Sequence, residues 1–131
     1  MSGHSLRLRL MPESFAICRL EPQAPVPAWL PRKGFTAVIR TAAELSIYSA
    51  EEAVPPEVQA ARGWRAFELA GPFAFTETGI IASVVAPLAE AGISVSVVAT
   101  YDTDYVFVSQ SALEGAVAVL TAAGHHILGR E

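Results

Sequence analysis

The sequence predicts an α+β fold whose second half, residues 64 to 128, has the element order β-α-β-β-α-β of a ferredoxin-like unit. Two observations predict it. Short runs in which apolar and polar residues alternate are typical of strands, and two longer segments repeat apolar residues at helical spacing. With 131 residues, 52 % of them apolar and 17 % charged, the chain can form one packed domain or two small ones that share a core.

The first half of the chain is expected to form four short strands. In the segment LRLRL, leucines alternate with Arg7 and Arg9, which is the pattern of a strand with one face in solvent. The proline-rich residues 25 to 31, PVPAWLP, leave room for only a helical turn between strands. The expected strands are residues 5 to 10, 15 to 20, 35 to 41 and 44 to 49.

A connector is expected at residues 51 to 63, EEAVPPEVQAARG, which are acidic and contain adjacent prolines. A helical turn can follow Pro56, because proline favours the first position of a helix. We therefore divide the chain at this connector into an N-terminal unit, residues 1–62, and a C-terminal unit, residues 63–131.

The C-terminal unit is expected to begin with a strand at residues 64 to 70 and to continue with a helix over residues 80 to 91. Pro87 lies inside this helix and is expected to kink it around Ser83, because proline lacks the backbone N–H that a helix uses and costs about 3 kcal/mol there. Gly92 is expected to end the helix. The apolar stripe of the helix consists of Ile80, Ile81, Val84, Val85 and Leu88.

A hairpin and a second helix complete the predicted unit. Residues 93 to 100 alternate in polarity and predict a strand, and a turn around Asp102 joins it to a second strand that contains YVFV. Ser111 and Glu114 have the spacing of a capping box for the following helix, which Gly124 ends. The segment HHILG supplies the last strand.

A ligand site is predicted where a loop and the hairpin meet. Right-handed crossovers place the loop TETGI, residues 76 to 80, and the hairpin TYDTDY, residues 100 to 105, at the same end of the sheet. The free N–H groups at the helix start favour an anion, whereas Asp102 and Asp104 favour a cation. A free amino acid carries both charges. Neutral hydroxyls are added by Thr76, Thr78, Ser83, Thr100 and Thr103.

The segment GIIASVVAPLAEAGISVSVVATYDTDYVFV, residues 79 to 108, resembles the ACT domain. It is most similar to the subgroup that includes small bacterial ACT proteins and the CASTOR-type arginine sensors, and it departs from that pattern at Ala99, where the subgroup often has serine. The upstream segments VPAWLPRKGF, IRTAAELSI and ARGWRAFEL also resemble this subgroup, so that the resemblance covers nearly the whole chain.

The resemblance implies a tandem of two ACT-like units, the first of them degenerate, with antiparallel sheets and helices on one face. It implies a regulatory module without catalytic chemistry or a cofactor, which binds an amino acid. A ferredoxin-like sheet leaves edge strands and one open face, so two chains are expected to associate as a homodimer that covers them. The ligand is expected in the loop after the first strand of the C-terminal unit, commonly across an interface between two such domains. The implied ligand-binding residues are Thr78, Gly79, Ile80, Ile81 and Ser83 on one side, and Thr100, Tyr101, Asp102, Thr103 and Asp104 on the other.

Other interpretations of these residues stay open at this stage. Asp102 and Asp104 can simply form a solvated turn, because aspartate side chains accept hydrogen bonds from their own backbone. The leading hypothesis is a sensor whose occupancy is read by an unidentified regulated protein. The alternative is a structural adaptor that only makes a dimer and whose pocket is vestigial. An enzyme that uses the two aspartates as an acid/base pair lacks support, since no nucleophile, metal set or cofactor motif accompanies them.

Composition argues against several other classes. The net charge is −4 and the basic residues are scattered, so no nucleic-acid surface is predicted. A single cysteine, Cys18, fits a reducing cytoplasmic location, and no segment has the length and hydrophobicity of a signal peptide or a membrane span. His125 and His126 are adjacent on a strand and point to opposite faces, so no metal site is expected.

Overall fold

The computed structural model describes residues 4–130, which form two compact units. One is Glu13–Trp64, here called the 13–64 unit; the other, here called the helical unit, combines the residues before Glu13 with those from Arg65 onward. This division differs from the expected one between residues 62 and 63, because the first strand of the chain joins the helical unit.

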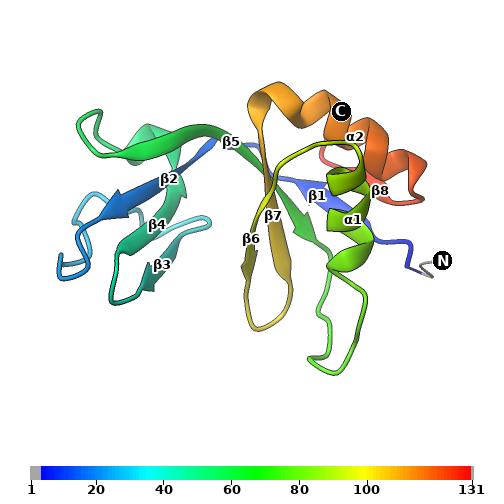
Figure 1. The fold of residues 1–131 in the computed structure, drawn as a ribbon, viewed down its shortest axis with the longest axis horizontal. Coiled ribbons are helices and arrows are strands. Elements are labelled where there is room, and N and C mark those ends of the chain that lie inside the picture. Colours follow the sequence, from blue (N-terminus) through cyan, green and yellow to red (C-terminus); the bar gives the residue numbers. More distant parts are fainter. Residues whose placement is uncertain (1–3, 131) are drawn as a thin grey trace. The chain divides into compact units, whose positions relative to one another are not determined.

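The 13–64 unit is an antiparallel sheet with the strand order β3-β4-β2-β5 (Figure 1). Its only helical element is a 3-10 turn, Glu51–Ala53, within a stretch that the structure describes in full. One side of the sheet is buried by Ala16, Cys18, Leu45, Ile47 and Val54, onto which Trp29 and Leu30 pack. The strands are β2 (Phe15–Leu20), β3 (Ala37–Arg40), β4 (Leu45–Ala50) and the first part of β5 (Ala60–Leu69).

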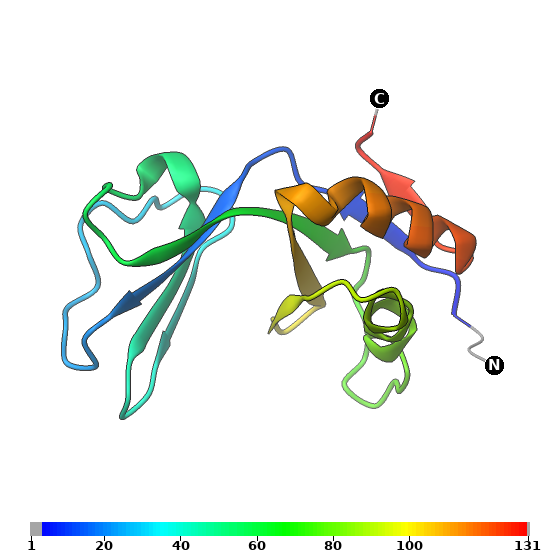
Figure 2. The same cartoon turned by 45° about the horizontal axis from the view of Figure 1, so that its top comes forward.

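The helical unit confirms the predicted order β-α-β-β-α-β. The elements are β5, α1 (Ala82–Glu90), β6 (Ser96–Ala99), β7 (Asp104–Ser109), α2 (Leu113–Ala122) and β8 (His126–Leu128). Both helices pack on one face of the sheet, because Val84 and Leu88 of α1 and Leu120 of α2 share a core with inward-facing strand residues (Figure 2). The fold is therefore α+β and of the ferredoxin type.

Strand β1 (Arg7–Leu10) is an addition to the ferredoxin-like unit. It lies between β5, with which it is antiparallel, and β8, with which it is parallel, so that the strand order is β6-β7-β5-β1-β8. The predicted alternation is confirmed, since Leu8 and Leu10 are buried in the core while Arg7 and Arg9 are exposed. Alternation fixes which face of a strand is buried, but it does not say which strands lie beside it.

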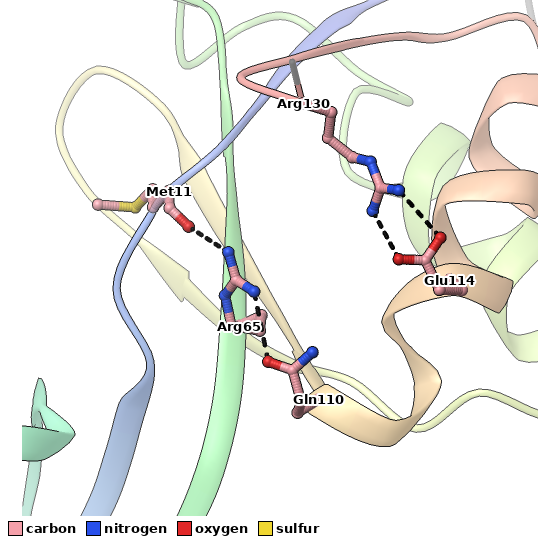
Figure 3. A network of polar contacts seen from close by, with 5 residues as sticks. All are labelled: Met11, Arg65, Gln110, Glu114 and Arg130. Carbon is pink, nitrogen blue, oxygen red and sulfur yellow. Dashed lines mark hydrogen bonds and ion pairs between the residues drawn. The ribbon is translucent and has the colours of Figure 1, made fainter.

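The start of α2 differs from the prediction. A 3-10 turn, Gln110–Ala112, precedes the helix, and the residue before the helix, Ala112, provides no side-chain cap. The predicted capping box was therefore wrong. Glu114 instead binds Arg130 through both carboxylate oxygens, at 2.9 and 3.0 Å (Figure 3), and the Ser111 hydroxyl contacts Ser109 Oγ at 3.1 Å.

A second polar cluster, centred on Arg65, connects three segments of the helical unit. The Arg65 guanidinium donates to the carbonyl oxygen of Met11 at 3.0 Å and to the side-chain oxygen of Gln110 at 3.3 Å (Figure 3). Arg65 thus links Met11, the residue after β1, to the turn that precedes α2.

No helix among residues 4–130 has the length and hydrophobicity needed to cross a membrane.

Candidate functional site

The hairpin between β6 and β7 is a tight turn over residues 100 to 103. Ala99 pairs with Asp104 at the ends of the two strands, and the Thr100 N–H donates to the Thr103 carbonyl oxygen at 2.7 Å. The Thr103 hydroxyl donates to the carbonyl oxygen of Leu69 at 2.6 Å, which ties the turn to the end of β5. Asp104 is consequently the first residue of a strand, whereas Asp102 lies in the turn.

The loop between β5 and α1 lies beside this hairpin, as the topology predicted (Figure 1). The Phe73 N–H donates to the carbonyl oxygen of Asp102 at 2.9 Å. The Phe75 and Tyr101 rings meet edge to face, with centroids 5.1 Å apart. Within the loop, the Glu77 carboxylate accepts the Ala74 N–H at 2.8 Å and closes a turn. Loop and hairpin are therefore joined by one backbone hydrogen bond and one aromatic contact.

Loop and hairpin together line a cavity of about 170 Å³, here called the hairpin cavity. Its wall includes the carboxylates of Glu77, Asp102 and Asp104, and none of the residues that line it is Lys or Arg. The cavity therefore favours a positively charged group. The lining residues are Phe73, Ala74, Phe75, Glu77, Ile80, Ala99, Thr100, Asp102, Thr103 and Asp104.

The two aspartates in the cavity wall differ in environment. Asp104 is half-buried, and burial raises the pKa of its carboxyl above the ordinary value. Asp102 is exposed. Neither carboxylate has a hydrogen-bond or ion-pair partner among residues 4–130. A partly desolvated carboxylate without a partner is stabilised by a cation, so Asp104 is the stronger candidate for ligand contact.

The start of α1 offers the opposite charge. Its first internal hydrogen bond runs from the Ser83 N–H to the Gly79 carbonyl oxygen at 3.0 Å. The backbone N–H groups of residues 79 to 82 donate to no acceptor in the described part of the chain. Free N–H groups at a helix start carry a partial positive charge and bind anions. Ile80 belongs both to this segment and to the wall of the hairpin cavity.

The structure does not bring all of the predicted site residues into this cavity. Gly79 and Ser83 line a different cavity of about 430 Å³ beside α1, together with His4 and His125. The Thr78 carbonyl oxygen contacts Nε2 of His4 at 3.0 Å. Ile81 packs against the core. Tyr101 does not line the hairpin cavity and is 81 % exposed, with its ring against Phe75.

Other residues of the cavity wall escaped the sequence analysis. Phe73, Phe75 and Glu77 lie in a loop without periodicity, where no pattern distinguishes a wall residue from a linker residue. The one available signal was the polar segment TETG before an apolar helix, since an acidic residue there can accept a backbone N–H of its own turn.

His125 has a structural role that the sequence analysis did not foresee. It is buried, and the Leu6 N–H donates to its Nδ1 at 3.1 Å. Nδ1 must therefore be the acceptor, so in the neutral ring Nε2 carries the proton and donates to the Ser83 carbonyl oxygen at 2.9 Å. Both ring nitrogens are engaged within the fold. Residues 4–130 contain no group of three or more His, Cys, Asp or Glu placed to hold a metal ion.

Comparison with protein families supports this description of the fold. A family model of the ACT domain matches residues 59–122, and a model of a separate N-terminal domain matches residues 13–57. The chain is 38 % identical to a protein from Agobacterium tumefaciens with a crystal structure, with a TM-score of 0.92, and the match covers 98 % of this chain and 96 % of that one. No protein with a curated description matches the sequence.

More distant solved structures share the fold. A protein of unknown function from Vibrio cholerae, described as a possible transport protein, is 23 % identical, with a TM-score of 0.73; the match covers 92 % of this chain and 91 % of that one. The regulatory subunit of aspartate kinase from Thermus thermophilus is 14 % identical, with a TM-score of 0.58, and the match covers 85 % of this chain and 93 % of that one.

Proposed function

We propose that this chain, which carries an ACT domain and belongs to one family with the Agobacterium tumefaciens protein, is a regulatory module that binds a free amino acid in the hairpin cavity. The observation that carries the proposal is Asp104, a half-buried carboxylate without a partner in the described chain, in the wall of a cavity beside free N–H groups. In this proposal the module has no catalytic chemistry of its own.

The proposed ligand contacts follow from the two charges of an amino acid. Its ammonium group meets Asp104, and its carboxylate accepts hydrogen bonds from free N–H groups at the start of α1, where Ile80 lines the cavity. Asp102, in the exposed turn, is the secondary acidic contact. The cavity volume of about 170 Å³ lies below the range of roughly 300 to 1,000 Å³ that drug-sized ligands occupy, which suits a small metabolite.

Comparison with solved structures supports a regulatory role. The Thermus thermophilus neighbour is the regulatory subunit of an enzyme, and it has the same fold. In our proposal the present chain acts in the same way, by passing its occupancy to another protein. We also propose that the 13–64 unit is a degenerate ACT-like unit, that two chains associate, and that the protein works in the cytoplasm, where Cys18 stays reduced.

Thermal unfolding in the presence of each of the twenty amino acids tests the proposal. A ligand that binds only the folded state raises the melting temperature in a concentration-dependent way, because it stabilises that state by mass action. We expect such a rise for one or a few amino acids, and its loss in Asp104→Asn. No rise at millimolar concentration, in a protein that remains dimeric, would favour a structural adaptor instead.

A further inference from the structure

A separate cavity of about 280 Å³, here called the sheet-face cavity, shares Asp102 and Thr103 with the hairpin cavity. Arg9 of β1 and Glu68 of β5 are cross-strand partners in its wall. Because Leu8 and Leu10 point into the helix-covered core, Arg9 points to the face of the sheet that the helices leave uncovered. The lining residues are Arg9, Glu68, Leu69, Ala70, Gly71, Pro72, Asp102 and Thr103.

Glu68 and Arg9 hold each other in this wall. Arg9 Nε donates to Glu68 Oε1 at 3.1 Å, and the Tyr105 hydroxyl donates to Glu68 Oε2 at 2.9 Å. Both oxygens of Glu68 are thus engaged, and Glu68 contacts the Arg9 guanidinium only at Nε. Among the described residues, the terminal nitrogens Nη1 and Nη2 of Arg9 have no hydrogen-bond partner.

The cavity therefore offers free groups of opposite sign. The two Arg9 terminal nitrogens can bind a carboxylate in a bidentate way, and the unpartnered Asp102 carboxylate can bind an ammonium group. This distinguishes it from the hairpin cavity, whose charged side chains are all acidic. Ala70, Gly71 and Pro72 form an uncharged part of the wall, which provides no partner for a charged side chain.

From these contacts we propose that the sheet-face cavity is a second amino-acid site, selective for a zwitterion with a small uncharged side chain. The ligand carboxylate binds the terminal nitrogens of Arg9, and its ammonium binds Asp102. The proposal does not rest on occupancy of the hairpin cavity. Asp102 and Thr103 line both cavities, so a ligand in either one would contact residues of the same turn.

L-Alanine is the probe for this site, measured by calorimetry and by amide chemical shifts of the full chain. N-acetylalanine, which lacks the ammonium group, and alanine amide, which lacks the carboxylate, are the matched ligands. We expect alanine to bind in the millimolar range and to shift the amides of Ala70 and Gly71, and we expect each analogue to bind at least about tenfold more weakly.

Protein variants assign the binding to one cavity. Arg9→Gln should weaken alanine binding at least about tenfold, the factor expected for a charge-assisted hydrogen bond. Arg7→Gln makes the same charge change two positions earlier on β1, outside the cavity wall, and should leave the affinity unchanged.

Three results would overturn the proposal. They are the absence of alanine binding up to about 20 mM, above the range of weak sites; equal affinity of Arg9→Gln and the wild type; and binding that disappears in Asp104→Asn but survives in Arg9→Gln. The last result places alanine in the hairpin cavity, so it would support the proposed function while refuting the second site. Unfolding of the ligand-free Arg9→Gln protein checks that the variant is folded.

Discussion

The imidazole of His125 donates a hydrogen bond to the carbonyl oxygen of Ser83, at 2.9 Å, inside the helical unit. In a regular helix this oxygen would accept the N–H of the residue four positions later. That residue is Pro87, which has no N–H, and α1 nevertheless runs unbroken from Ala82 to Glu90. The side chain of His125, the residue before β8, thus satisfies the carbonyl group that the proline leaves free.

Replacing His125 by leucine should destabilise the protein by about 2 to 6 kcal/mol. The change leaves the Ser83 carbonyl oxygen and the Leu6 N–H without their partner in a buried place, and each unsatisfied buried group costs about 1 to 3 kcal/mol. Urea unfolding of both proteins measures the difference. A loss below about 1 kcal/mol would mean that water replaces the ring at both groups.

Pro87→Ala provides a matched background for this experiment. Alanine at position 87 restores the N–H that can donate to the Ser83 carbonyl oxygen within the helix. His125→Leu should therefore be less harmful in the Pro87→Ala protein than in the wild type, by about 1 kcal/mol or more. Equal losses in the two backgrounds would contradict the link between the histidine and the proline.

The sequence predicted the order and ends of the secondary-structure elements better than the polar contacts between them. The helix-ending glycines Gly92 and Gly124, both with positive φ, and the meeting of loop and hairpin follow from local patterns and crossover handedness. The position of β1 between β5 and β8 does not, because LRLRL fits many partners equally well. His125 illustrates the same limit, since its two hydrogen bonds join segments 119 and 42 residues away.

The sequence predicted the residues of the candidate site that flank the hairpin turn, but it missed the loop residues in the cavity wall. Asp104 and Thr100 were expected there because they flank a turn between two strands, and both line the hairpin cavity. Gly79 was expected on a ligand-facing backbone, yet it lines the cavity beside α1. Phe75 enters the wall only because the loop folds back on the hairpin through its contact with Tyr101. No spacing rule describes such a loop.

Asp104→Asn should weaken binding of the amino acid found in the thermal screen by about 1.5 to 3 kcal/mol, the range for a hydrogen bond to a charged group. Asp102→Asn should weaken it less, because that carboxylate is exposed and screened by solvent. Calorimetry on both variants measures the two losses. Unchanged affinity in both would refute the ammonium contact and leave TYDTDY as a solvated turn.

The ligand-free protein should show the effect of Asp104 on stability as a function of pH. Burial raises the pKa of this carboxyl, so the charged form is disfavoured in the folded state. Its contribution is absent below the pKa of an aspartate in the unfolded chain, becomes unfavourable as the pH rises through the folded pKa, and stays so at neutral pH. Asp104→Asn should thus be slightly more stable than the wild type at pH 7, and equal to it near pH 3. Unfolding curves that coincide at both pH values would argue against a desolvated carboxylate.

Tyr105 should ionise late when the folded protein is titrated. Burial, the hydrogen bond to Glu68 and the negative charges of Glu68 and Asp102 raise its pKa from 10.0 to about 12. The stability that this shift provides is present below pH 10 and is lost as the pH rises through the folded value. Ultraviolet titration measures the phenolate, and Glu68→Gln should lower the apparent pKa. Ionisation of Tyr105 near 10 in the folded protein would show that the phenol is not held by Glu68.

Gly79→Val should separate the role of the helix start in binding from its role in stability. Gly79 has a φ of 81°, which a β-branched residue adopts only with strain, and an added Cβ would lie 3.3 Å from Nε2 of His4. The substitution should therefore cost stability and also shift the free N–H groups of residues 79 to 82.

Gly92→Val is the matched control, because Gly92 has a φ of 77° at the other end of α1 and open space around its Cβ position. We expect similar unfolding losses in urea but a loss of amino-acid binding only in Gly79→Val. If the two variants bind the ligand equally well, the carboxylate does not lie on the start of α1.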